Sequence, residues 1–136
     1  MTLQPIRRKV LIVEDQPTIR NVLYVLLAGL GCDGDVASGA KMALSMIQQE
    51  SFDAVLLDLR CSELPPEEVV AKIKGLRPNL VGRVLVITGE VTDPQTLEVI
   101  ERNCLPHVPR NRVAEELWER LRSLLGLSRP SAGTSS

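Results

Sequence analysis

The chain has 136 residues, with 16 lysines and arginines against 17 aspartates and glutamates and a formal net charge of −1 at pH 7. This length suits one domain with its own hydrophobic core, and the balanced charge argues against direct nucleic-acid binding. The three cysteines, Cys32, Cys61 and Cys104, are odd in number and far apart, so we expect reduced thiols in a cytoplasmic protein rather than a disulfide framework. The apolar stretch before Glu14 is too short for a signal peptide or a membrane span.

Short apolar runs alternate with stretches of helical period, a pattern that predicts repeated strand–helix units and a parallel sheet. Pro106 and Pro109 restrict the fifth strand to an edge of the sheet, because proline cannot donate a hydrogen bond to a neighbouring strand. The predicted strands cover residues 9–14, 35–37, 52–58, 83–88 and 105–108.

Each predicted strand is followed by a helix whose apolar side chains recur at helical spacing. The helices are expected to begin at Pro17, after Gly39, at Pro65 or Pro66, after a cap at Thr92 or Asp93, and at Val113, where the last helix runs to Leu125. The side chains expected to face the core are Ile19, Val22, Leu23, Leu26, Leu27, Leu30, Met42, Ala43, Met46, Ile47, Val69, Val70, Ile73, Leu76, Leu97, Ile100, Val113, Leu117, Leu121 and Leu124.

Residues 8–126 are expected to form a single domain, preceded by a short leader at residues 1–7. After Gly126 the sequence Leu-Ser-Arg-Pro-Ser-Ala-Gly-Thr-Ser-Ser has too little apolar content to pack. Residues 127–136 are therefore predicted to be a flexible tail.

Polar side chains stand where three of the apolar runs end. One run is followed by Glu14 and Asp15, another by Asp58, and a third ends in Thr88. Because the carboxyl ends of parallel strands lie at the same edge of an open α/β sheet, these side chains should converge. Three carboxylates and a hydroxyl together predict a divalent-cation site and phosphoryl chemistry at an aspartate.

Each of these residues also has a simpler interpretation. Glu14 and Asp15 precede Pro17 and suit a helix cap. Asp58 suits a turn that ends a strand, and Thr88 is an ordinary strand residue. The joint pattern favours the metal and phosphoryl interpretation, because a nucleophile and the donors that stabilise its product must converge.

Taken together, these residues resemble the receiver domain of bacterial two-component response regulators, over about residues 8 to 126. The resemblance lies in the order and spacing of three stretches: Val-Leu-Ile-Val-Glu-Asp at 10–15, Ala-Ser-Gly with Ala-Leu within 37–44, and Val-Leu-Leu-Asp-Leu at 55–59. It implies a flavodoxin-like, doubly wound α/β fold with a five-stranded parallel sheet in the order 2-1-3-4-5.

The resemblance also implies roles for the polar residues. Asp58 would accept phosphate from a histidine kinase or a histidine phosphotransfer protein. Mg²⁺ would be held by Glu14, Asp15 and Asp58 and by the backbone carbonyl of Arg60. Thr88 would bind the transferred group and take part in the switch.

The chain departs from the family pattern at the end of the fifth strand, where a lysine usually followed by proline is missing. An ungapped count from Thr88 places Arg110 in the lysine position, and we favour this alignment. The alternative keeps Pro109 as the family's proline and puts Val108 in the lysine position, which would leave the switch without its cation. His107 takes the place of the family's switching tyrosine or phenylalanine, where an imidazole could respond to pH near neutrality.

A second departure lies in the loop after the predicted phosphoacceptor, where the family usually has an apolar residue, a proline and a glycine. Here the first of these positions is Arg60. Its charge suggests an ion pair with Glu90, which lies two residues beyond Thr88.

We therefore expect a stand-alone phosphoacceptor switch that is not an enzyme in the usual sense. It would bind a kinase through its first helix. A target protein, or a second copy in a homodimer, would bind the fourth helix, fifth strand and fifth helix. The alternative is a degenerate receiver that binds a partner without phosphorylation. A phosphohydrolase is disfavoured, because such enzymes usually carry a second aspartate at the position of Arg60.

Overall fold

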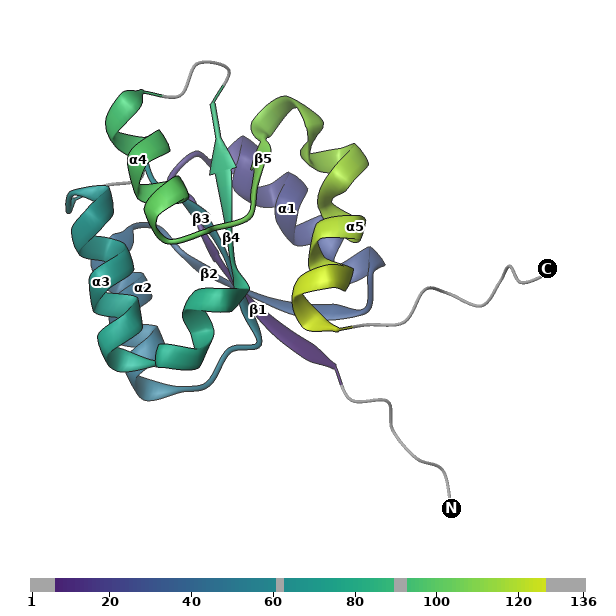
Figure 1. Ribbon diagram of the computed structural model, residues 1–136. Helices are drawn as coiled ribbons and strands as arrows, with labels where there is room; N and C mark the ends of the chain where they lie inside the picture. The colour runs from purple at the N-terminus through teal and green to yellow at the C-terminus, as the bar shows by residue number, and fades with distance from the viewer. Residues whose placement is uncertain (1–6, 61–62, 90–92, 127–136) are drawn as a thin grey trace.

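The computed structural model describes residues 7–60, 63–89 and 93–126. Five parallel strands form one sheet in the order β2-β1-β3-β4-β5, which confirms the predicted α/β fold (Figure 1). The expected leader and tail, apart from Arg7, lie outside the described residues. The elements are β1 (Arg8–Val13), α1 (Pro17–Gly29), β2 (Cys32–Ala37), α2 (Ala40–Gln49), β3 (Ala54–Asp58), α3 (Pro66–Leu76), η1 (Pro78–Arg83), β4 (Val84–Thr88), α4 (Pro94–Arg102), β5 (His107–Pro109), η2 (Arg110–Arg112) and α5 (Val113–Leu125).

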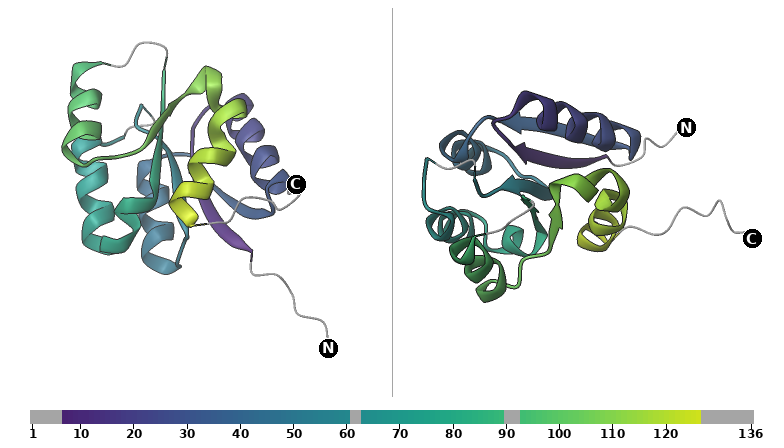
Figure 2. Two further views of the ribbon diagram at one scale, coloured as in Figure 1. Left: turned by 45° about the vertical axis from the view of Figure 1, so that its right-hand side comes forward. Right: turned by 90° about the horizontal axis from the view of Figure 1, so that it is seen from above.

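The helices cover both faces of the sheet. Helices α1 and α5 lie on one face and α2, α3 and α4 on the other (Figures 1 and 2). Alternate residues of each strand point to opposite faces, so Leu56 packs toward α1 and α5 while Leu57 packs toward the other three helices. Strands β3 and β4 are buried along their whole length, as expected for the centre of a parallel sheet.

All five predicted strands differ from the observed bounds: β1 covers residues 8–13 rather than 9–14, β3 covers 54–58 rather than 52–58, and β4 covers 84–88 rather than 83–88. Strand β2 begins at Cys32 rather than at residue 35, because all six of its residues pair in register with β1 despite the weak strand propensity of Asp33 and Gly34. Strand β5 covers residues 107–109 rather than 105–108, and its partner is β4 alone, as the two prolines require of an edge strand.

The helix starts and ends agree more closely with the sequence patterns than the strand ends do. Helix α5 has the predicted bounds, and Asp93 caps α4 by accepting a hydrogen bond from the backbone amide of Thr96 at 3.1 Å. The predicted burial of Val22, Met42, Leu76 and Leu97 was wrong, since each side chain is more than a third exposed. Helical spacing gives the apolar face, but the width of that face depends on how closely the neighbouring helix approaches.

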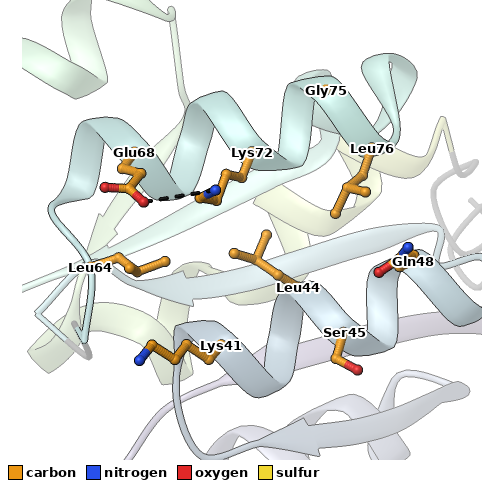
Figure 3. Close-up of a pocket in the computed structure, with 9 residues that line it drawn as sticks. All are labelled: Lys41, Leu44, Ser45, Gln48, Leu64, Glu68, Lys72, Gly75 and Leu76. Carbon is orange, nitrogen blue, oxygen red and sulfur yellow. Dashed lines mark ion pairs between the residues drawn. The ribbon is translucent and has the colours of Figure 1, made fainter.

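A groove with a volume of about 690 Å³ lies between α2 and α3. Figure 3 shows Leu44 of α2 and Leu76 of α3 directed into the space between the helices. On the α3 side, Lys72 pairs with Glu68 at 3.8 Å. The residues that line this groove do not include Glu14, Asp15 or Asp58, the acidic residues predicted to form the functional site.

No helix within the described parts of the chain is long and apolar enough to cross a membrane.

Two glycines at the end of α1 are expected to respond oppositely to substitution by alanine. Gly31 has a positive φ of +78°, and an added Cβ would meet no atom within 4 Å, so Gly31→Ala is expected to lower the free energy of unfolding by about 1 kcal/mol through backbone strain alone. Gly29 lies within the helix and also has open space around it, so Gly29→Ala should be neutral or raise stability by up to about 1 kcal/mol. Urea denaturation of both variants checks this, and a loss of similar size in both would show that contacts, not backbone conformation, decide the effect.

Candidate functional site

The polar residues predicted from the sequence gather at one edge of the sheet. Strands β1 and β3 are neighbours, and Val13 pairs with Leu57. Glu14 and Asp58 are the next residues along these two segments, so they lie beside each other at the end of the sheet. Strand β4 pairs with the other side of β3, and Thr88 ends it one residue beyond the partner of Asp58.

The three carboxylates form a compact cluster. One ligand oxygen from each of Glu14, Asp15 and Asp58 lies within 4.8 Å of the others. Glu14 is fully buried, Asp58 is 2% exposed, and Asp15 is exposed to solvent. The predicted convergence of these side chains is therefore confirmed.

The cluster has the properties of a site for a hard divalent cation. All three side chains offer oxygen, the ligand atom that Mg²⁺ prefers. The Oε1 atom of Glu14 is buried and has no hydrogen-bond partner, so an acceptor is left open inside the cluster. The residues present thus fit the Mg²⁺ predicted from the sequence, whereas the role of the Arg60 carbonyl stays a prediction.

The guanidinium group of Arg110 reaches into this cluster from the turn η2. Its Nη2 atom lies 2.6 Å from Oδ2 of Asp58 and 3.7 Å from Oε1 of Glu14. The side chain is only 19% exposed, and its Nε atom is buried without a hydrogen-bond partner. Val108, the alternative equivalent of the family lysine, is fully buried in the core beneath α5.

Arg60 makes a second set of contacts with the same aspartate. Its backbone amide donates to Oδ1 of Asp58 at 2.9 Å, and its Nε lies 3.4 Å from that oxygen. The Arg60 side chain is half exposed, so this ion pair is weaker than that of Arg110. The predicted pairing of Arg60 with Glu90 falls outside the described residues, because Glu90 is not among them.

The side-chain contact between Arg60 and Asp58 was not foreseen from the sequence. A basic residue two positions after an aspartate that ends a strand was the available signal. The chain turns there, so the side chain folds back onto the strand end. The predictions for Arg60 were limited to a metal contact through its backbone carbonyl and an ion pair with Glu90.

Electrostatics within the cluster act most strongly on Glu14. Burial raises the pKa of Glu14 to about 7, and the negative charge of Asp58 adds to the rise. The backbone amide of Gln16 donates to Oε2 of Glu14 at 3.2 Å and opposes this rise only in part. Burial and the charge of Asp58 therefore favour the protonated form of this carboxyl group in the metal-free protein.

The two predicted switch residues lie on neighbouring strands, but His107 pairs with Val86, two residues before Thr88. The hydroxyl of Thr88 donates to the backbone carbonyl of Val108 at 3.4 Å, a long hydrogen bond within a buried site. His107 lies on β5, one residue before Val108, and its side chain is exposed. A change in the orientation of the Thr88 side chain would therefore alter its hydrogen bond to β5.

The comparisons with known proteins agree with this geometry. A family model described as the response regulator receiver domain matches residues 10–122, and the chain belongs to this family. The family serves two-component signalling and is not a family of catalytic enzymes.

Two curated relatives illustrate the range of the family. The chain is 27% identical over 128 residues to the response regulator MprA of Mycobacterium tuberculosis, a match that covers 94% of this chain and 55% of the relative. It is 27% identical over 99 residues to the transcriptional regulatory protein ZraR of Escherichia coli, covering 73% of this chain and 22% of the relative. The chain thus spans about half the length, or less, of these curated relatives.

Solved structures support the fold independently. A response regulator from Chloroflexus aurantiacus superposes with a TM-score of 0.77 at 20% identity, covering 88% of this chain and 98% of that one. A receiver domain protein described as CheY-like, from Methanospirillum hungatei, gives a TM-score of 0.72 at 20% identity, covering 87% of this chain and 96% of that one.

Proposed function

We propose that this protein is a phosphoacceptor switch in which Asp58 receives a phosphoryl group from a phosphohistidine donor. The observation that carries the proposal is the buried Asp58 carboxylate at the sheet edge, within 4.8 Å of two further carboxylates and in contact with Arg110. Membership of the receiver family supplies the reaction class.

Glu14, Asp15 and Asp58 would hold Mg²⁺ through their side chains, and Arg60 would do so through its backbone carbonyl. When bound, this ion offsets the negative charges of the carboxylates and of the incoming phosphoryl group. Glu14 follows the end of β1, Asp58 ends β3, and both side chains are buried, so their oxygens are held in place before any donor arrives.

In the transfer itself, one oxygen of Asp58 attacks phosphorus as the bond between phosphorus and the donor's imidazole nitrogen breaks. The electron pair of that bond stays on the imidazole, which leaves and takes up a proton. The backbone amide of Arg60 already donates to Oδ1 of Asp58, and this contact fixes the orientation of the carboxylate.

The conformational change would be driven by the phosphoryl oxygens on Asp58, which are new hydrogen-bond acceptors. The hydroxyl of Thr88 would exchange its long hydrogen bond to the Val108 carbonyl for a bond to a phosphoryl oxygen, and Arg110 would offer its unused Nε–H. Hydrogen bonds to a charged group contribute about 1.5 to 3 kcal/mol each. A shift from 1:99 to 99:1 between two states needs roughly 5.5 kcal/mol, so Thr88 and Arg110 acting together would nearly suffice.

The loss of the Thr88 contact would free β5, and His107 would be the residue that changes orientation. The face formed by α4, β5 and α5 is our candidate for binding a target protein or a second copy. Leu97 of α4 and His107 of β5 are both exposed there.

Helix α1 is our candidate surface for the histidine kinase or histidine phosphotransfer protein. It exposes Val22, Tyr24 and Val25 at 42%, 49% and 67%. An apolar group of this kind on an otherwise polar surface is typical of a protein-binding site.

A degenerate receiver is the second candidate function, and one observation favours it. Both oxygens of Asp58 are already in contact with guanidinium groups, those of Arg60 and Arg110. Such pairing could hold one conformation permanently, without phosphorylation.

One experiment separates the two functions. Incubation with acetyl phosphate and Mg²⁺ is expected to add a single phosphoryl group to the wild-type protein by intact mass, and Asp58→Asn should abolish the addition. Asp33→Asn, which alters an exposed aspartate paired with Arg7, is the matched control and should be modified normally. Absence of modification in the wild-type protein would favour the degenerate receiver.

A further inference from the structure

The Arg110 guanidinium lies between the two buried carboxylates of the cluster. Its Nη2 atom is 2.6 Å from Asp58 and 3.7 Å from Glu14, so one cationic group serves both. These two side chains are 2% and 1% exposed, and water therefore contributes little to their neutralisation. In the resting protein the positive charge that the acidic cluster requires comes from the chain itself.

This arrangement leaves two polar atoms unsatisfied. Oε1 of Glu14 and Nε of Arg110 are both buried without a hydrogen-bond partner. The Nη2 atom that donates to Asp58 lies 3.7 Å from Oε1 of Glu14, which is too far for a hydrogen bond. The resting contact is thus incomplete for Glu14, whose oxygen remains open to a better cation.

We propose that Arg110 is an internal competitor of the divalent cation, so that metal binding requires its guanidinium group to withdraw from Asp58. The inference rests on the proposed function, since it assumes the metal site formed by Glu14, Asp15 and Asp58. A dication and a guanidinium beside the same carboxylates repel each other, and the metal has the larger charge.

The position of Arg110 gives this competition a structural consequence. Arg110 begins the turn η2, which joins β5 directly to α5. Its withdrawal from Asp58 therefore acts on the segment that leads into α5. Metal binding would therefore change the conformation of the β5–α5 segment before any phosphoryl group is transferred.

Arg60 is a weaker competitor on the same reasoning. Its side chain is half exposed, and its guanidinium contacts Asp58 at 3.4 and 3.5 Å. Displacement into solvent is easier for such a group than for the 19% exposed Arg110. The competition is therefore assigned to Arg110.

The test is a direct measurement of Mg²⁺ affinity by titration calorimetry, with no phosphoryl donor present. Arg110→Gln is expected to bind Mg²⁺ about tenfold more tightly than the wild-type protein. Arg112→Gln is the matched control: it removes a positive charge two residues away that pairs with Glu116 instead, and its affinity should stay within about twofold of wild type. Asp58→Asn should weaken binding strongly.

A second readout follows the β5–α5 segment through the fluorescence of Trp118, which lies on α5 and is the sole tryptophan of the chain. Mg²⁺ should change the fluorescence of the wild-type protein and of Arg112→Gln. It should change that of Arg110→Gln much less, because no guanidinium has to withdraw.

The outcomes distinguish this inference from the proposed function. If the wild-type protein binds Mg²⁺, Asp58→Asn does not, and Arg110→Gln is no tighter than wild type, the competition is wrong and the metal site stands. If no variant binds Mg²⁺, both proposals fail. Should circular dichroism show that Arg110→Gln does not fold, Arg110→Lys replaces it. Its point-like ammonium should also tighten binding, and an affinity equal to or below that of wild type would overturn the competition.

Discussion

Replacement of Arg110 by alanine is expected to lower the free energy of unfolding of the metal-free protein by about 2 to 4 kcal/mol. The reason is that Asp58 and Glu14, both almost fully buried, would lose the cation that they share. Removal of one partner from a buried ion pair typically costs about 3 to 5 kcal/mol, and the 19% exposure of Arg110 and the remaining contact with Arg60 reduce that figure here. Urea denaturation in the presence of a chelator measures the loss.

A double variant tests whether the loss comes from the ion pair. In an Asp58→Asn background the arginine has lost its principal partner, so Arg110→Ala should then cost much less than it does in the wild-type protein. Arg112→Ala, which disrupts a solvent-exposed pair with Glu116, should change stability little. Equal losses with and without Asp58 would mean that Arg110 stabilises the fold through packing and not through charge.

The gathering of acidic residues at one edge of the sheet was predictable, because strand ends and strand order fix where these residues lie. An apolar run that ends in acidic residues, repeated in a second strand, places Glu14 and Asp58 together whenever the strands are parallel neighbours. The pairing of Val13 with Leu57 fulfils that condition. The start of α4 was predictable for a similar local reason, since Asp93 and Pro94 are a cap and a first-turn residue.

Long-range contacts were not predictable in the same way. The contact between Arg110 and Asp58, which are 52 positions apart, was expected only from the family resemblance, because strand periodicity does not fix where the η2 turn directs a flexible side chain. The exposure of Val22 and Leu97 depends on the spacing between neighbouring helices. The strand propensity of residues 32–34 is weak, and their pairing with β1 overrides it.

The metal-free protein is expected to lose stability as the pH rises from about 4.5 to about 7, because of Glu14. Burial and the charge of Asp58 raise the pKa of this carboxyl group to about 7 in the folded protein, whereas in the unfolded chain it titrates at its ordinary value. Between these two values the folded state binds more protons than the unfolded state. The stabilising contribution is thus complete below the unfolded pKa and is lost as the pH rises through the folded pKa, with a size on the order of 3 kcal/mol.

Glu14→Gln isolates this effect, because an amide does not ionise. Urea denaturation at about pH 5 and about pH 8 with a chelator should show a smaller fall in stability for the variant than for the wild-type protein, and the variant should be the more stable of the two at the higher pH. Glu115→Gln, at an exposed site on α5, should parallel the wild-type protein. Saturating Mg²⁺ should reverse the order at the higher pH, since a ligand that binds only the folded state stabilises it by mass action and Glu14 is one of the ligands. Parallel curves for wild type and Glu14→Gln without metal would mean that Arg110 already keeps Glu14 ionised, and that the acidic cluster needs no proton at neutral pH.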